Sequence, residues 1–391
     1  MKQFFRLIGI ATLVLGILFF TSKYWFISAD IYIYNSKSYP SKNCEVILDD
    51  YKNQKIVNIG ESMHGSESIK AFEVCISKYL IQNLGFKKIF LENEYTSTTK
   101  MNAFVHGDNI SISSGSLIEM YEKFTLDNSK SLYEFLIWIR LYNSKQSKSQ
   151  MVSIYGLEST NLNLIYTKIL NTKRRLKNLK SNSKEFLFLQ KTVCTNSDVG
   201  NFYQYVNTHV AYAEDCLIDL SKSKLSTNAE ESIGFLLFQF QLALKQFLSK
   251  VSRDEIMKIN FESLYKGQKS ITLTHSGHNF PGYDIKNFAS ELSNKSQYSI
   301  IISACSGEIM NFDYSVGKRF DLNLEEPKKD SVDYEICNRK ERVSRFQRII
   351  GQGYSNEADK NEYYRIQQDV GHMVYLKKSE PLDPFFEVGR L

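Results

Sequence analysis

Residues 56–65, with the sequence IVNIGESMHG, limit the possible folds more than any other stretch of the chain. Ile56, Val57 and Ile59 form a short apolar run typical of a buried strand, and glycine at position 60 ends it. Two ionisable residues, Glu61 and His64, follow at once. The stretch therefore predicts a strand that carries a carboxylate and an imidazole at its carboxyl end.

The next residues complete a β-α-β unit. Residues 66–84 place apolar side chains at helical spacing: Ile69, Phe72, Ile76, Tyr79, Leu80 and Leu84. Gly85 follows where helices commonly end, and a second apolar run at 88–91 stops at Glu92. Ligands of open parallel sheets bind at the carboxyl ends of the strands, so these polar residues predict an acid–base site.

Other short apolar runs predict four more strands: 151–156, 270–274, 299–303 and 375–376. Residues 94–150 have mainly helical patterns, and the charged stretch 325–365 is expected to form loops. We therefore expect an α/β fold with a mostly parallel central sheet flanked by helices, within a domain spanning 50–390. Residues 160–265 hold long helical patterns and predict a helical subdomain inserted between strands.

The amino terminus has the pattern of an export segment. Lys2 and Arg6 precede an uncharged apolar run at 7–20, which predicts a signal peptide or an uncleaved membrane anchor over residues 1–29. An anchor is favoured because bulky side chains stand ahead of the small residues at 28–29. We expect a membrane-anchored or secreted protein whose remaining chain is extracytoplasmic, with the membrane contacted through the N-terminal helix.

Six cysteines in an exported chain permit disulfides. Cys194 and Cys216 flank one helical stretch and are the expected pair. Cys75 lies near an apolar helix stripe and Cys305 just after a buried strand, so both are predicted to be buried thiols. Neither a CxxC motif nor the spacing of a zinc knuckle occurs.

The net charge of +6 is spread thinly. The one dense basic cluster, at 173–180, is interpreted as a solvated helix face, because nucleic-acid modules have stronger and more interleaved basic patterns. We therefore expect no nucleic-acid partner.

Further ionisable residues follow the later strands. Glu158 follows the run at 151–156, and His275 and His278 follow the run at 270–274. Histidine is the side chain best suited to move protons near neutral pH, and a neighbouring carboxylate fixes its tautomer. The nucleophile motif GxSxG is missing, so water is favoured over serine as nucleophile, although Ser276 stands between two histidines. Each histidine alone is also compatible with a structural role in a turn.

Five segments together resemble the erythromycin esterase family over about residues 50–310. They are GESMHG at 60–65, FLENEY at 90–95, YGLE at 155–158, SRDEIMKIN at 252–260 and LTHSGHN at 273–279. Glu158 stands where that family usually has aspartate, and the arginine that commonly follows its HG turn is absent here.

The resemblance implies a hydrolase acting on a small ester or lactone without a cofactor. His64 would be the general base on water, Glu61 and Glu92 would orient it, and His275 and His278 would bind or polarise the carbonyl. Arg253 and Asp254 would brace the site or cap a helix, and Glu158 would support it.

Two alternatives are open at this stage. The GExxHG turn also resembles distant relatives that bind metal or haem, and in such a protein the histidines would be ligands; yet HSGH is not the helical HExxH signature, so the metal signal is weak. A surface protein that kept the fold without activity is the third possibility, but buried ionisable groups without a function would only cost stability.

Overall fold

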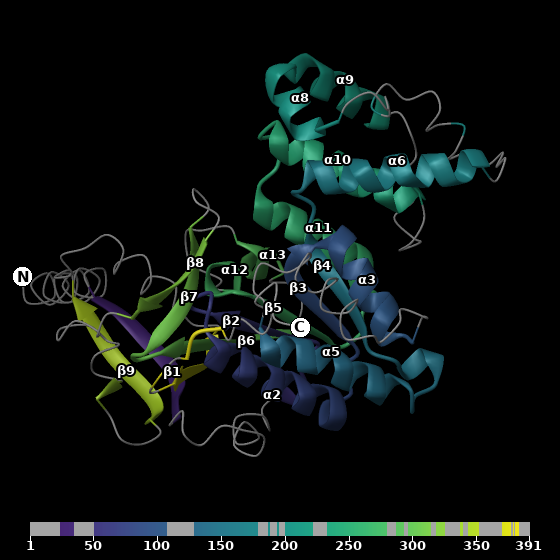
Figure 1. The fold of residues 1–391 in the computed structure, drawn as a ribbon. Helices are drawn as coiled ribbons and strands as arrows, with labels where there is room; N and C mark the ends of the chain where they lie inside the picture. Colours follow the sequence, from purple (N-terminus) through teal and green to yellow (C-terminus); the bar gives the residue numbers. More distant parts are fainter. Residues whose placement is uncertain are drawn as a thin grey trace, which may run out of the picture.

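The computed structural model describes residues 24–34, 51–107, 129–178, 187, 194, 200–221, 233–279, 287–292, 296–313, 318–324, 337–338, 343–351, 370–376, 378 and 380–382. They form an α/β fold around an eight-stranded sheet with the order β4-β3-β5-β2-β6-β10-β1-β9 (Figure 1). The strands are β1 Tyr24–Tyr34, β2 Ile56–Glu61, β3 Lys88–Glu94, β4 Ser153–Glu158, β5 Ser270–His275, β6 Gln297–Ala304, β9 Val343–Gly351 and β10 Val370–Leu376.

Seven of these strands are mutually parallel, and β9 alone runs antiparallel, against β1. The mostly parallel sheet expected from the sequence is thus confirmed. All six strands predicted from apolar runs occur, as β2 to β6 and β10. The central strand β2 pairs with β5 and β6, and this register sets Glu61 beside His275 on one side and Ile302 on the other.

Two parts of the sheet differ from the prediction. Residues 343–351 form β9, although the stretch 325–365 was expected to form loops. Residues 24–34 form β1, which overlaps the end of the predicted export segment at 1–29. The two strands pair with each other at one edge of the sheet, more than 300 positions apart in sequence, and local composition gives no sign of that partnership.

The expected apolar run at 7–20 lies outside the described residues. Within the part of the chain that the structure describes, no helix is long and apolar enough to cross a bilayer.

Helices cover both faces of the sheet. α2 (Glu67–Leu84), α3 (Tyr95–Val105) and α5 (Lys130–Asn143) pack on one face, against alternate strand residues such as Ile59 and Ile271. α11 (Arg253–Tyr265) and α13 (Phe288–Glu291) pack on the other, against Phe90 and Leu157. The alternation is what a strand buried on both faces requires.

α2 begins and ends as the sequence predicts. Ser66 is its N-cap, with the hydroxyl accepting from the Ile69 N–H at 3.2 Å. Gly85 follows the last turn in the left-handed conformation, with a φ of 71°. This capping fixes where the helix starts relative to the end of β2.

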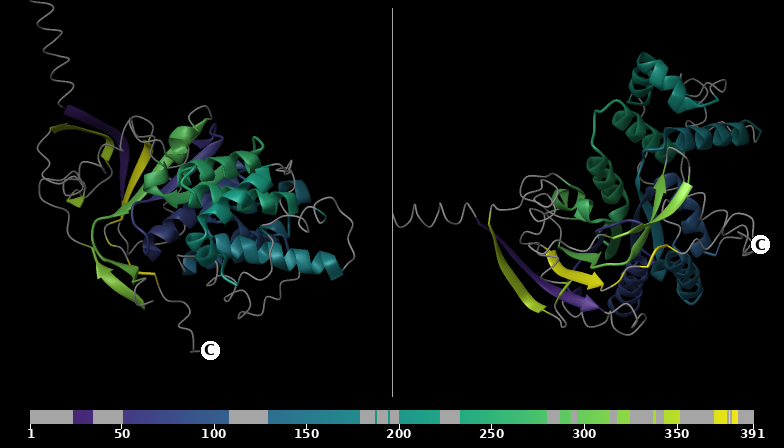
Figure 2. Two further views of the ribbon diagram at one scale, coloured as in Figure 1. Left: turned by 90° about the horizontal axis from the view of Figure 1, so that it is seen from above. Right: turned by 60° about the vertical axis from the view of Figure 1, so that its left-hand side comes forward.

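Between β4 and β5 the chain leaves the sheet. α6 (Leu162–Asn178), α8 (Phe202–Thr208), α9 (Val210–Ser221) and α10 (Ile233–Phe247) pack around an apolar cluster of their own. Figures 1 and 2 show this helical group projecting away from the sheet. α6 starts only four residues after β4 ends, so the group begins at the carboxyl edge of the sheet. α11 then brings the chain back to that edge.

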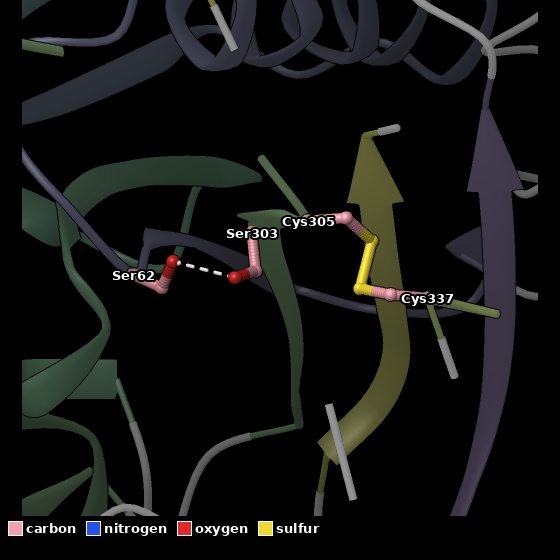
Figure 3. The surroundings of a disulfide bond; sticks show 4 residues. All are labelled: Ser62, Ser303, Cys305 and Cys337. Carbon is pink, nitrogen blue, oxygen red and sulfur yellow. Dashed lines mark hydrogen bonds between the residues drawn. A yellow bond between two sulfur atoms is a disulfide. The ribbon is translucent and has the colours of Figure 1, made fainter. Parts of the chain in front are cut away.

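The disulfides confirm one cysteine prediction and correct two. Cys194 and Cys216 are bonded, as expected. Cys305 is bonded to Cys337, and Cys75 is disulfide-bonded as well, so neither is a buried thiol. Figure 3 shows the Cys305–Cys337 bridge next to the end of β6. A pairing of this kind depends on how distant segments approach, which the sequence pattern of either cysteine does not carry.

A hairpin of β7 (Glu308–Asp313) and β8 (Lys318–Asn323) follows β6. It contacts the turn after β2, where the Met310 N–H donates to the Gly65 carbonyl at 2.8 Å. Gly65 has a φ of 85°, and a Cβ there would lie 1.8 Å from the Met310 oxygen. Only glycine fits a turn that is both left-handed and this closely covered.

Candidate active site

The first half of the site stands at the end of β2. Glu61 is the last residue of that strand and is buried, while the side chain of His64 is 54% exposed. Nδ1 of His64 lies 2.7 Å from Oε1 of Glu61. An ionised carboxylate only accepts hydrogen bonds, so Nδ1 carries the proton and Nε2 of a neutral His64 is left able to accept one.

His275 faces His64 from the neighbouring strand. It is the last residue of β5, and the two ring centroids are 4.9 Å apart. The backbone N–H of Gly277 donates to Nδ1 of His275 at 3.1 Å, which places the proton of the neutral ring on Nε2. Burial lowers the pKa of His275, and a protonated His64 would lower it further, against the opposing effect of Glu92 and Glu61. His275 is therefore a neutral imidazole with an N–H to donate.

Glu92, near the end of β3, contacts both His275 and Arg253. Its Oε2 accepts the backbone N–H of His275, and its Oε1 lies 2.6 Å from Nη2 of Arg253. Burial acts to raise the pKa of Glu92, but His278, the His275 N–H and Arg253 together hold it well below its ordinary value. Glu92 is thus a fixed negative charge.

His278 lies on α12 (Ser276–Asn279), a short helical turn that directly follows β5. Its Nδ1 is 2.7 Å from Asp254 and its Nε2 is 3.4 Å from Glu92. Burial by itself lowers the pKa of His278, but the two carboxylates outweigh it and raise the pKa to about 9. His278 therefore carries a positive charge at neutral pH, unlike His275 three residues earlier.

Arg253 links the carboxylates of β3 and β4. Its Nε donates to Oε1 of Glu158 at 2.5 Å, and its Nη2 reaches both Glu158 and Glu92. The helix cap of α11 comes from Ser252, whose hydroxyl accepts the Glu255 N–H. The guanidinium thus lies in the ion-pair network and not at the helix cap, while Asp254 accepts the Phe288 N–H as well as contacting His278.

The structure brings all eight residues singled out in the sequence to the carboxyl edge of one sheet: Glu61, His64, Glu92, Glu158, Arg253, Asp254, His275 and His278. Strand register explains most of this arrangement. β2, β5, β3 and β4 are parallel neighbours, so their ends meet at the same edge.

Two charged residues next to the site were missed. Lys70 of α2 lies 2.8 Å from Oε2 of Glu61, and Glu73 lies 3.3 Å from the same ammonium group. Both are buried. Lys70 and Glu73 are three apart, a spacing that usually means an exposed helix pair; the only sequence signal was their place on the same face as the apolar stripe.

A serine pair lies at the ends of β2 and β6. The hydroxyl of Ser62 donates to that of Ser303 at 2.9 Å, as Figure 3 shows. Ser276, the serine between the two histidines, is buried. Among the described residues, no group of three or more His, Cys, Asp or Glu side chains is arranged to hold a metal ion.

Comparison with known proteins shows the fold. No protein-family model matches the chain. A succinoglycan biosynthesis protein superimposes with a TM-score of 0.64 at 14% identity, over 88% of this chain and 93% of the other. A Bacillus cereus protein gives 0.60 at 16% identity, over 91% and 97%. A histidine-to-asparagine mutant of the erythromycin esterase EreC, in its open conformation, gives 0.53 at 14% identity, over 75% and 82%. The chain thus shares its fold with EreC and with the succinoglycan biosynthesis protein, at low sequence identity.

Proposed function

We propose that this protein is a hydrolase of the erythromycin esterase type, in which His64 activates water to attack the carbonyl of an ester or lactone. The observation that carries the proposal is the Glu61–His64 pair facing His275. Glu61 holds the Nδ1 proton, so the lone pair of a neutral His64 is on Nε2, the atom that would take a proton from water. A fold shared with EreC supports the same reading.

His275 and His278 have different tasks in this mechanism. The neutral His275 presents an Nε2–H that can donate to the carbonyl oxygen as negative charge develops on it. The cationic His278 keeps Glu92 ionised, and Glu92 in turn fixes the backbone of His275. Protonated His64 then returns its proton to the leaving alcohol, which completes the hydrolysis.

Water is the nucleophile because the nearby hydroxyls are engaged or covered. The Ser62 proton goes to Ser303, and Ser276 is buried. No acyl-enzyme forms in this mechanism, so intact-mass spectrometry during turnover should show only unmodified protein.

The experiment that tests the proposal is a hydrolysis screen of the purified protein against neutral esters and lactones, with and without chelator. We expect chelator-insensitive hydrolysis of at least one class, lost in Glu61→Gln. A stoichiometric metal or haem band in a protein that hydrolyses nothing would support the binding alternative instead.

We also propose that the domain acts outside the cytoplasm. The Cys194–Cys216 and Cys305–Cys337 disulfides support this location, because such bonds persist mainly in oxidising compartments. The partner would be a small molecule, and the membrane would be contacted through the apolar run at 7–20, ahead of β1.

A further inference from the structure

A buried lysine stands behind the proposed general base. Lys70 lies in the first turns of α2, and its side chain is 11% exposed. Its ammonium is 2.8 Å from Oε2 of Glu61, the carboxylate oxygen that does not face His64. A buried ammonium is costly unless it is paired, and this ion pair provides the opposite charge.

Glu73 pairs with Lys70 as well, so four ionisable side chains form a row of consecutive contacts. Its Oε2 is 3.3 Å from the Lys70 ammonium, and its side chain is 2% exposed. The order of groups is therefore Glu73, Lys70, Glu61 and His64, with charges alternating from the helix to the imidazole. Only the last member of the row is substantially exposed.

We propose that Lys70 is a positioning residue that holds Glu61 with one oxygen turned toward His64 and offsets part of the pull of that carboxylate on the imidazole. The inference rests on the proposed function for its catalytic meaning. An imidazole beside an uncompensated buried carboxylate would stay protonated, and a protonated His64 has no free nitrogen for water. Lys70 keeps the base both aligned and available.

Among the described residues, charged and titratable groups of four elements lie near His64 or act on it through a neighbour. They are Glu61 at the end of β2, Lys70 and Glu73 on α2, His275 at the end of β5 and, beyond His275, Glu92 on β3. The α2 pair acts through Glu61, whereas His275 and Glu92 belong to the neighbouring strands β5 and β3. Changing Lys70 or Glu73 therefore leaves in place the hydrogen bonds of His275 to Gly277 and to Glu92.

The test is the pKa of His64, measured by NMR of the ring Cε1–H in the full chain. Six histidines give few signals, and His64→Gln assigns the one of interest. Lys70→Met removes the positive charge, so the pKa of His64 should rise by about one unit. Glu73→Gln removes a negative charge behind Lys70, so the pKa of His64 should fall by a smaller amount.

The pKa of His64 should shift in opposite directions in Lys70→Met and Glu73→Gln, which a purely structural role of Lys70 would not produce. Lys70→Arg keeps the charge and should leave the pKa of His64 within about 0.3 units of the wild-type value. If Lys70→Met leaves that pKa unchanged or lowers it, the inference is wrong. Should Lys70→Met fail to fold, Glu73→Gln decides alone: a fall supports the inference, and no change or a rise overturns it.

These pKa values do not depend on any substrate. If the pKa of His64 shifts as predicted but the protein hydrolyses nothing, the proposed function is wrong and the electrostatic role of Lys70 is still supported. If the pKa of His64 does not shift in these variants but the protein hydrolyses esters, only the proposed role of Lys70 is wrong.

Discussion

Gly65 allows a comparison of two glycines that share a backbone conformation and differ in their surroundings. Gly65 and Gly85 have φ values of 85° and 71°. A Cβ at Gly85 would meet nothing within 4 Å, whereas a Cβ at Gly65 would lie 1.8 Å from the Met310 oxygen. Alanine should therefore cost only backbone strain at one position and strain plus a collision at the other.

The magnitudes follow from these contacts. The left-handed conformation costs an alanine about 1–2 kcal/mol, which is the whole expected effect of Gly85→Ala. Gly65→Ala must also push the β7 hairpin away, which threatens the hydrogen bonds from Met310 N and Leu382 N to the Gly65 carbonyl. Each is worth about 1 kcal/mol, so Gly65→Ala should cost about 3–4 kcal/mol in total.

Chemical denaturation followed by circular dichroism measures both free energies of unfolding. The adjacent His64 should also be displaced, so Gly65→Ala should lose hydrolysis while Gly85→Ala keeps it. The reasoning would be refuted if the two variants lost equal stability, because the collision with Met310 would then have no consequence.

Two further predictions concern stability. Against the effect of burial, the two neighbouring carboxylates raise the pKa of His278 in the fold to about 9, above the ordinary value of 6.5. Its protonation therefore stabilises the protein fully below pH 6.5, and this contribution, about 3 kcal/mol, is lost as the pH rises through 9. Urea unfolding at pH 6.5 and 9 should show that fall, and a smaller one in Asp254→Asn; a fall of the same size in the variant would contradict the assignment. Replacing Cys194 and Cys216 with serine opens a loop with a sequence separation of 22 and should cost about 3 kcal/mol in denaturant. No loss relative to the wild type would show that the bond does not form in solution.

The sequence was sufficient for the centre of the fold because that part obeys local rules. Each of β2, β3, β4 and β5 is a short apolar run that stops at or just before a polar residue, and the helix between β2 and β3 ends at Gly85 as expected. Parallel pairing then brings the strand ends together without further information. The contacts of Glu61, His64, Glu92 and His275 follow from that arrangement.

The features that the sequence did not predict depend on contacts between distant segments. β9 mixes charged and apolar residues, and its strand character comes from pairing with β1. Cys305 is bonded across 32 positions to Cys337, and no local pattern marks the pair. Lys70 resembles any surface lysine on a helix, and only the angle at which α2 packs against the end of β2 brings it to Glu61.

Chemical rescue of His64→Ala tests the central claim most directly, because the half-exposed position of His64 leaves room for added imidazole. With an ester that the wild type cleaves, the variant should be slower by about 10²–10⁴-fold, and imidazole should restore part of the rate in its unprotonated form. Glu61→Ala is the matched control, since imidazole should not restore its activity. A His64→Ala variant that hydrolyses the ester at the wild-type rate would contradict the account.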